Sequence, residues 1–145
     1  MTYEDYSRTA DNYDRTRRPV GLPIILGCFA MNDRPLSALH VLDAGCGTGS
    51  FAVQVSPRVG RISGVDASQA MVSQAIAKAA AAQIQSNRFS ATTGQLEDLP
   101  FADAEFDGAM VNQVLHHLSD PDGSFARLRR PSRSCGESCG REAIW

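Results

Sequence analysis

Three glycines that alternate along one short segment form the most informative pattern in this chain. Gly45, Gly47 and Gly49 follow a strand-like run of apolar residues. Because glycine has no Cβ and accepts positive φ angles, such a loop turns sharply and lets a polar ligand approach bare backbone N–H groups. The helix expected after the loop adds the positive end of its dipole. The segment therefore predicts a loop that binds the polar part of a ligand.

Two carboxylates stand at the ends of the strand-like runs on either side of this loop. Asp43 ends the first run, and Asp66 closes a second run at residues 62–65. An acid at the end of the second strand can accept hydrogen bonds from ribose hydroxyls. A simpler interpretation makes Asp43 a brace for the loop and Asp66 an N-cap for the next helix, and both interpretations can hold together.

The spacing of the glycines is a poor match to that of dinucleotide-binding proteins. A dinucleotide fingerprint requires G-x-G-x-x-G, whereas here Ser50 occupies the position of the third glycine and Gly49 precedes it. A nicotinamide-dependent oxidoreductase therefore stays open as an alternative that fits less well.

A strand-end Asp43, G-x-G-x-G and a strand-end Asp66, in this order, resemble the class I S-adenosylmethionine-dependent methyltransferases. Three later segments extend the resemblance: Leu-Glu-Asp-Leu-Pro-Phe at 96–101, Phe-Asp-Gly-Ala-Met-Val at 106–111, and Leu-His-His-Leu-Ser-Asp-Pro at 115–121. They look like the small-molecule branch that includes the ubiquinone and menaquinone methyltransferases. The resemblance covers residues 41–130.

Strand-like and helix-like segments alternate along this region, which predicts an α/β fold with a parallel sheet and right-handed crossovers. The strands are expected at 39–42, 61–65, 88–92 and 106–111, and the helices at 48–56, 68–85, 114–118 and between 121 and 130. The resemblance implies the Rossmann-like sheet of class I methyltransferases in the order three-two-one-four, incomplete after strand four, with the cofactor at the carboxyl ends of the strands.

The chain divides into three expected parts. Residues 1–36 are expected to form a helical cap, 37–130 the amino-terminal part of an S-adenosylmethionine-binding domain, and 131–145 a disordered, aberrant tail. The tail is rich in Ser, Gly, Cys and Arg and has no apolar periodicity. The family's strands five to seven have no counterpart, so we expect a truncated or frameshifted product whose strand-four edge is uncovered and open to self-association.

The resemblance also implies a set of cofactor-binding residues. The amino-terminal segment carries aromatic residues at helical spacing. In the family, such a segment closes over the cofactor. The simpler interpretation is a helix that packs on the domain. Gln95 stands where many relatives have Asp, so the hydrogen bond to adenine is expected to survive in a weaker form. The full set comprises Tyr13, Asp43, Gly45, Cys46, Gly47, Gly49, Asp66, Ala67, Gln95, Leu96 and Asn112.

His116 and His117 follow strand four and are the candidate catalytic residues, because a histidine there can accept a proton from the methyl acceptor. Packing or loop bracing is the simpler interpretation. Methyl transfer from a sulfonium is a displacement on an already activated donor, so the protein mainly positions the reactants and no metal is expected. The implied function is methyl transfer to a small-molecule acceptor; the alternative is a module that binds the cofactor without turnover.

Composition and charge argue against several other classes of function. A net charge of −2 over 145 residues gives no basic footprint for nucleic acid. The longest apolar stretch, residues 20–31, is shorter than the ~20 residues that span a bilayer. The acidic, aromatic amino terminus does not look like a secretory signal, and Cys135 and Cys139 have no second pair for zinc. We expect a soluble, cytoplasmic protein with free thiols.

Overall fold

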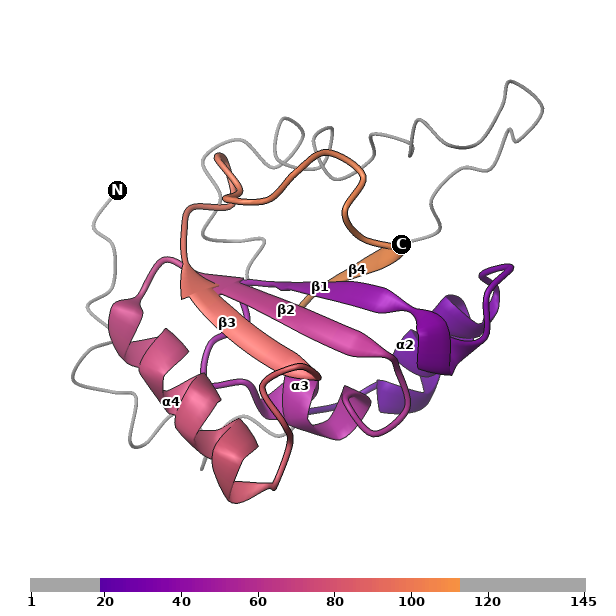
Figure 1. Cartoon of the computed structure of the whole chain (residues 1–145), viewed down its shortest axis with the longest axis horizontal. Coiled ribbons are helices and arrows are strands. Elements are labelled where there is room, and N and C mark those ends of the chain that lie inside the picture. The colour runs from indigo at the N-terminus through magenta and orange to yellow at the C-terminus, as the bar shows by residue number, and fades with distance from the viewer. Residues whose placement is uncertain (1–18, 113–145) are drawn as a thin grey trace.

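The computed structural model describes residues 19–112, which form a parallel sheet with helices packed on one face (Figure 1). The elements follow one another as α2 (Leu22–Ala30), the short 3-10 helix η2 (Leu36–Ala38), β1 (His40–Ala44), α3 (Ser50–Val55), β2 (Arg61–Asp66), α4 (Gln69–Ala81), β3 (Phe89–Thr93) and β4 (Gly108–Val111). The expected alternation of strands and helices is confirmed.

The four strands are all parallel and lie in the order β3-β2-β1-β4. The chain therefore adds β2 and β3 on one side of β1 and then crosses to place β4 on the other side. The register sets Ala44 beside Val65 of β2 and Val111 of β4. Because ligands of such sheets bind where the strand order reverses, the carboxyl ends of β1 and β4 are the place to look for a site. The predicted strand order is confirmed.

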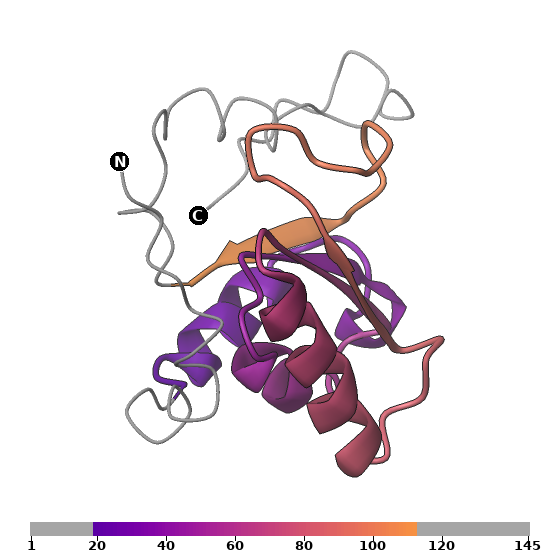
Figure 2. The ribbon, with the colours of Figure 1, turned by 90° about the vertical axis from the view of Figure 1, so that its left-hand side faces the viewer.

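The larger core lies between the sheet and the helices, which all cover the same face (Figure 2). Alternate strand residues point to this face, and α4 brings its apolar stripe to meet them. The fully buried members include Val41, Val55, Val59, Ile62 and Ala75.

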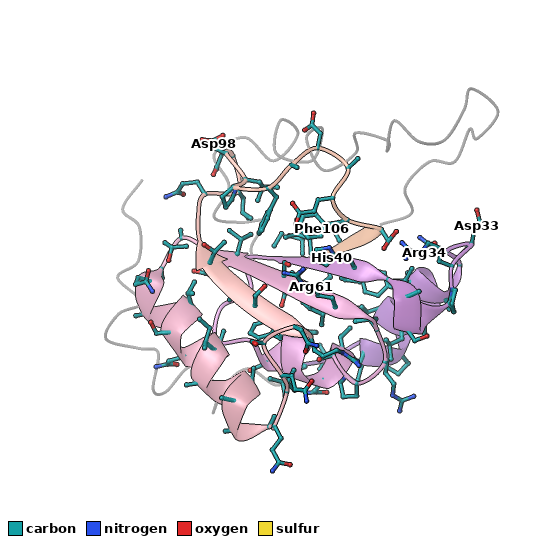
Figure 3. The ribbon with its side chains drawn as sticks, in the orientation of Figure 1. Asp33, Arg34, His40, Arg61, Asp98 and Phe106 are labelled. Atoms are coloured by element: carbon teal, nitrogen blue, oxygen red, sulfur yellow. The ribbon has the colours of Figure 1, made fainter. Side chains whose placement is uncertain are left out.

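The opposite face of the sheet is covered by the segment between β3 and β4, residues 94–107, here called the β3–β4 segment (Figures 1 and 2). Phe106 lies against His40 with ring centroids 4.7 Å apart, and meets Phe101 edge-on at 5.0 Å. Figure 3 shows His40 beside Phe106, and Asp98 at the far end of the same segment. These aromatic contacts anchor the segment that carries Gln95 and Leu96.

Asp107 fixes the amino-terminal edge of the sheet. Its carboxylate accepts a hydrogen bond from the His40 backbone N–H at 2.8 Å and pairs with Arg34 at 2.6 Å. The side-chain amide of Asn32 donates to the backbone carbonyl of Asp107 at 3.2 Å. Asp107 therefore joins the α2–β1 connection, the start of β1 and the start of β4.

Most element boundaries differ from the sequence-based expectation by one to four residues. The apolar stretch at 20–31 contains α2, and no helix within residues 19–112 is long and apolar enough to cross a membrane. Helix α4 stops at Ala81, because Gln83 adopts a φ of 58° and Ile84 donates back to the carbonyl of Ala79, which turns the Ile84 side chain toward the core. Strand β4 starts at Gly108, although the Asp107 N–H just before it already donates to the carbonyl of His40 at 2.9 Å.

The remaining expectations concern residues outside 19–112. The helices at 114–118 and after 121 lie outside the described residues, as do the amino-terminal aromatic stripe and the tail. The division into three parts at residues 36 and 130 therefore stays a prediction.

Candidate functional site

The glycine loop turns at the carboxyl end of β1, as its composition predicts. Gly45, Gly47 and Gly49 have φ angles of 75°, 52° and 77°. The backbone N–H groups of Gly45 and Cys46 both donate to the carbonyl of Val65, at 2.8 and 2.9 Å. The loop is therefore fixed to the end of β2 by backbone contacts that need left-handed residues.

Gly49 allows α3 and α4 to approach closely. A Cβ at Gly49 would lie 3.0 Å from the Cβ of Ala75 and 3.1 Å from its Cα. Below the loop, the Lys78 ammonium donates to the hydroxyls of Ser50 at 2.8 Å and Thr48 at 3.0 Å. Neither Ala75 nor Lys78 was expected from the sequence, because each looks like an ordinary residue of an amphipathic helix.

Asp66 joins the loop to the start of α4. One carboxylate oxygen accepts from Gly47 N–H at 2.9 Å and the other from Ser68 N–H at 2.9 Å. Its backbone carbonyl accepts from Gly94 N–H at 3.0 Å, which brings the β3–β4 segment to the same place. The N-cap of α4 is Ser68, not Asp66. Since a carboxylate offers about four acceptor positions, Asp66 can brace the loop and still accept from hydroxyls of a ligand.

Asp43 lies beneath the loop and is only 1% exposed. Its Oδ2 atom has no hydrogen-bond partner within the part of the chain that the structure describes. Burial raises the pKa of Asp43 to about 7, and the nearby charge of Asp66 adds to this effect. Burial and the same two carboxyl groups also raise the pKa of the Cys46 thiol, so Cys46 stays protonated.

Asn112 supplies a second unsatisfied polar atom at the neighbouring strand end. It follows β4 directly, and its Nδ2 is buried without a partner among residues 19–112. Buried polar groups are almost always hydrogen-bonded, so an acceptor on Asp43 and a donor on Asn112 without partners need an explanation. A ligand that carries both a donor and an acceptor group would satisfy them.

The other predicted site residues fall into two groups. Gln95 is exposed. Leu96 packs its side chain on the sheet, and Ala67 is half-buried between Asp66 and Ser68. Tyr13, His116 and His117 lie outside the described residues. Gly64 was missed, although a glycine inside a strand is a signal of close approach: a Cβ there would lie 2.9 Å from the Cys46 Sγ atom.

The strand order, the left-handed glycine loop and the strand-end carboxylates agree with a comparison against protein families, in which the family described as "Methyltransferase domain" matches residues 41–136. The chain belongs to the class I S-adenosylmethionine-dependent methyltransferases. The expected Rossmann-like fold and the family's cofactor are thereby confirmed.

Several methyltransferases are similar to this one. O-methyltransferase resE of Aspergillus sclerotiorum is 38% identical over 95 residues, which cover 65% of this chain and 36% of resE. The uncharacterized methyltransferase YcgJ of Bacillus subtilis is 40% identical over 97 residues, covering 67% of this chain and 38% of YcgJ. The crystal structure of YcgJ superposes with a TM-score of 0.65 at 29% identity, over 75% of this chain and 44% of that one. The chain spans less than half the length of these relatives.

We predict that Gly49→Ala destabilises the chain by roughly 2 to 4 kcal/mol, because it adds left-handed strain to a clash with Ala75. Gly27→Ala is the matched control: Gly27 lies inside α2 and nothing is within 4 Å of its added Cβ. The control should be neutral or more stable by about 0.5–1 kcal/mol. Urea unfolding of the three proteins measures both effects, and equal stabilities for the two variants would contradict the packing argument.

We also predict that Asp43 makes stability fall as pH rises. The folded carboxyl keeps its proton up to a pKa of about 7, whereas the unfolded one loses it near its ordinary pKa of 3.8. The folded state therefore binds more protons in this window, so the contribution of Asp43 to stability becomes less favourable by roughly 2 to 3 kcal/mol between pH 5 and pH 8.

Asp43→Asn removes this titration while keeping the size of the side chain. The difference in unfolding free energy between the variant and the original chain should grow in favour of the variant from pH 5 to pH 8. Denaturant unfolding at the two pH values measures it, and a difference that stays constant with pH would show that Asp43 is ionised throughout.

Proposed function

We propose that this chain binds S-adenosylmethionine at the carboxyl ends of β1, β2 and β4, and that it transfers the methyl group to a small-molecule acceptor. The observation that carries the proposal is the position of two unsatisfied buried atoms, Asp43 Oδ2 and Asn112 Nδ2, at adjacent strand ends beside the glycine loop. The third such atom in the described residues, Arg88 Nε, belongs to a guanidinium that donates to the carbonyls of Ser56 and Val59. An amino-acid group offers an ammonium donor for the first and a carboxylate acceptor for the second.

The site has a place for each part of the cofactor. Asp66 accepts from the ribose hydroxyls with the lone pairs that Gly47 and Ser68 leave over. Gln95 and Leu96 receive the adenine, because the bond from Gly94 to Asp66 holds the start of the β3–β4 segment beside the ribose position. When bound, the cofactor supplies an activated methyl group on a sulfonium, and the protein holds the donor in an orientation from which displacement can occur.

The nature of the acceptor is proposed from the relatives. Proteins named O-methyltransferase, including resE and the Penicillium expansum protein cnsE, are 38% and 31% identical to this chain in the matched regions. They support an acceptor that is a small molecule with a reactive oxygen. His116 and His117 are proposed to accept the proton that such an oxygen loses.

A second candidate is binding of the cofactor without turnover. The candidate catalytic residues His116 and His117 lie outside the described residues, so the described site accounts for cofactor binding alone. Methyl transfer to any member of a broad panel of hydroxylated metabolites would support catalysis. Binding of S-adenosylhomocysteine with no transfer to any acceptor would support the second candidate.

Calorimetric titration with S-adenosylhomocysteine tests the site, with NADH as the control ligand. We predict saturable binding of S-adenosylhomocysteine alone. Within this experiment, Gln95→Asp should tighten binding about threefold to tenfold, because a charged acceptor forms a stronger hydrogen bond to the adenine amino group.

Gln95→Asn is the matched control for this substitution, since it shortens the side chain to the length of Asp and keeps it neutral. It should not tighten binding. Unchanged or weaker binding by Gln95→Asp would remove Gln95 from the adenine site.

Self-association through β4 is a separate proposal. Within the described residues β4 pairs with β1 alone, and Gly108–Val111 contains no charged residue or proline that would discourage another strand. Sedimentation velocity over a range of concentrations should reveal dimers, and a monomer at every concentration would exclude this edge as an interface.

A further inference from the structure

The environment of Asp43 is unusual for a carboxyl group that is expected to meet a cation. The side chain is 1% exposed, and its Oδ2 has no hydrogen-bond partner among residues 19–112. The charged group that acts on it is another carboxylate, Asp66 on β2, and the neighbouring titratable group is the Cys46 thiol in the loop. Two acids and a thiol thus lie close enough beside the glycine loop to act on one another.

Charge in such a space is costly unless a partner of opposite sign enters with it. Two carboxylates close together in a low dielectric do not both ionise readily, and an isolated buried anion loses its hydration. A bound ammonium removes both difficulties, because it pairs with the carboxylate and donates hydrogen bonds to it. The free site therefore favours the acid form of Asp43, and the site with an ammonium favours the carboxylate.

We propose that Asp43 exchanges its proton for the ammonium of the ligand, so that binding at pH 6 releases about one proton. The Asp43 O–H bond breaks, the proton passes to solvent, and the carboxylate pairs with the ammonium. This proposal rests on the function proposed above, because it assigns the amino-acid ammonium of the cofactor to Asp43. The exchange makes Asp43 a selector for ligands that carry this cation.

Another titratable group in the sheet could imitate the effect and must be separated from it. His40 lies at the start of β1, at the opposite end of the strand, where its Nε2 is 2.8 Å from the Ser63 hydroxyl. Burial and then the charge of Arg61 lower its pKa, while Glu105 and Asp107 act in the other direction. His40→Gln removes this titration. Because His40 also packs on Phe106, the control is read as the ratio of the affinities at the two pH values and not as the affinity at one pH.

The test is calorimetry at pH 6 and pH 8 with two ligands. S-adenosylhomocysteine carries the amino-acid group, and 5′-methylthioadenosine lacks it. A carboxyl that must ionise with a pKa of about 7 makes S-adenosylhomocysteine bind about tenfold more tightly at pH 8 than at pH 6. The affinity for 5′-methylthioadenosine should change less than twofold. At pH 6, titrations in buffers of different ionisation enthalpy should show close to one proton released per S-adenosylhomocysteine bound.

Variants assign the effect to one residue. His40→Gln should keep the tenfold dependence, and Asp43→Asn should lose it. Carbon-13 NMR of aspartate carboxyl groups gives a readout that does not need the variant to bind: the signal absent from Asp43→Asn should titrate near pH 7 in the free protein and be that of a carboxylate at pH 6 in the complex.

The outcomes separate this proposal from the function on which it rests. No binding of S-adenosylhomocysteine at pH 8 would overturn the proposed cofactor site itself. Binding of equal affinity at both pH values, without proton release, would leave that site in place and overturn the exchange at Asp43. An Asp43 signal already in the carboxylate form at pH 6 in the free protein would likewise overturn the exchange and leave the cofactor site in place.

Discussion

The Asp66 carboxylate is the contact on which the rest of the site depends. The two carboxylate oxygens accept hydrogen bonds from Gly47 N–H and Ser68 N–H, and the backbone carbonyl of Asp66 accepts one from Gly94 N–H. The glycine loop, the start of α4 and the start of the β3–β4 segment therefore share one residue at the end of β2. Since each of these segments comes from a different part of the chain, the geometry of the site is fixed by the sheet register that places Asp66 beside the loop.

The sequence was sufficient for the fold of the described region because strand-like and helix-like segments alternate along it. The G-x-G-x-G pattern predicted the sharply turning loop, and the helix expected from residue 68 begins there, where the Ser68 hydroxyl accepts from Met71 N–H. The end of α4 was not predictable in the same way. Gln83 in the left-handed region is an uncommon C′ residue, and what favours it is the burial of Ile84, a tertiary effect.

The site was predictable as a set of residues, though not as a set of contacts. Asp43 and Asp66 look equivalent in the sequence, since each is an acid at a strand end. In the structure they differ completely: both oxygens of Asp66 accept backbone hydrogen bonds, whereas Asp43 is buried with one oxygen unsatisfied. The difference arises from position in the sheet. Asp43 lies inside the central strand, between Gly64 of β2 and Met110 of β4, whereas Asp66 is the last residue of β2. The sequence does not state which strand will be central.

The unsatisfied side-chain atoms of Asp43 and Asn112 also mark a place where the fold is less stable than it would be with satisfied or apolar groups. A buried carboxyl next to a second one is unfavourable for folding, and Asn112 adds a donor without a partner in the described region. Neither residue is needed to form its strand, because β1 and β4 are held by their ladder and by the apolar residues on both faces. Polar groups that destabilise a fold, and that lie together where the strand order reverses, are better explained by a ligand than by the fold itself. The same reasoning explains why the Asp107 cluster at the other end of the sheet is structural: the hydrogen bonds and the ion pair of its carboxylate join parts of the chain to one another.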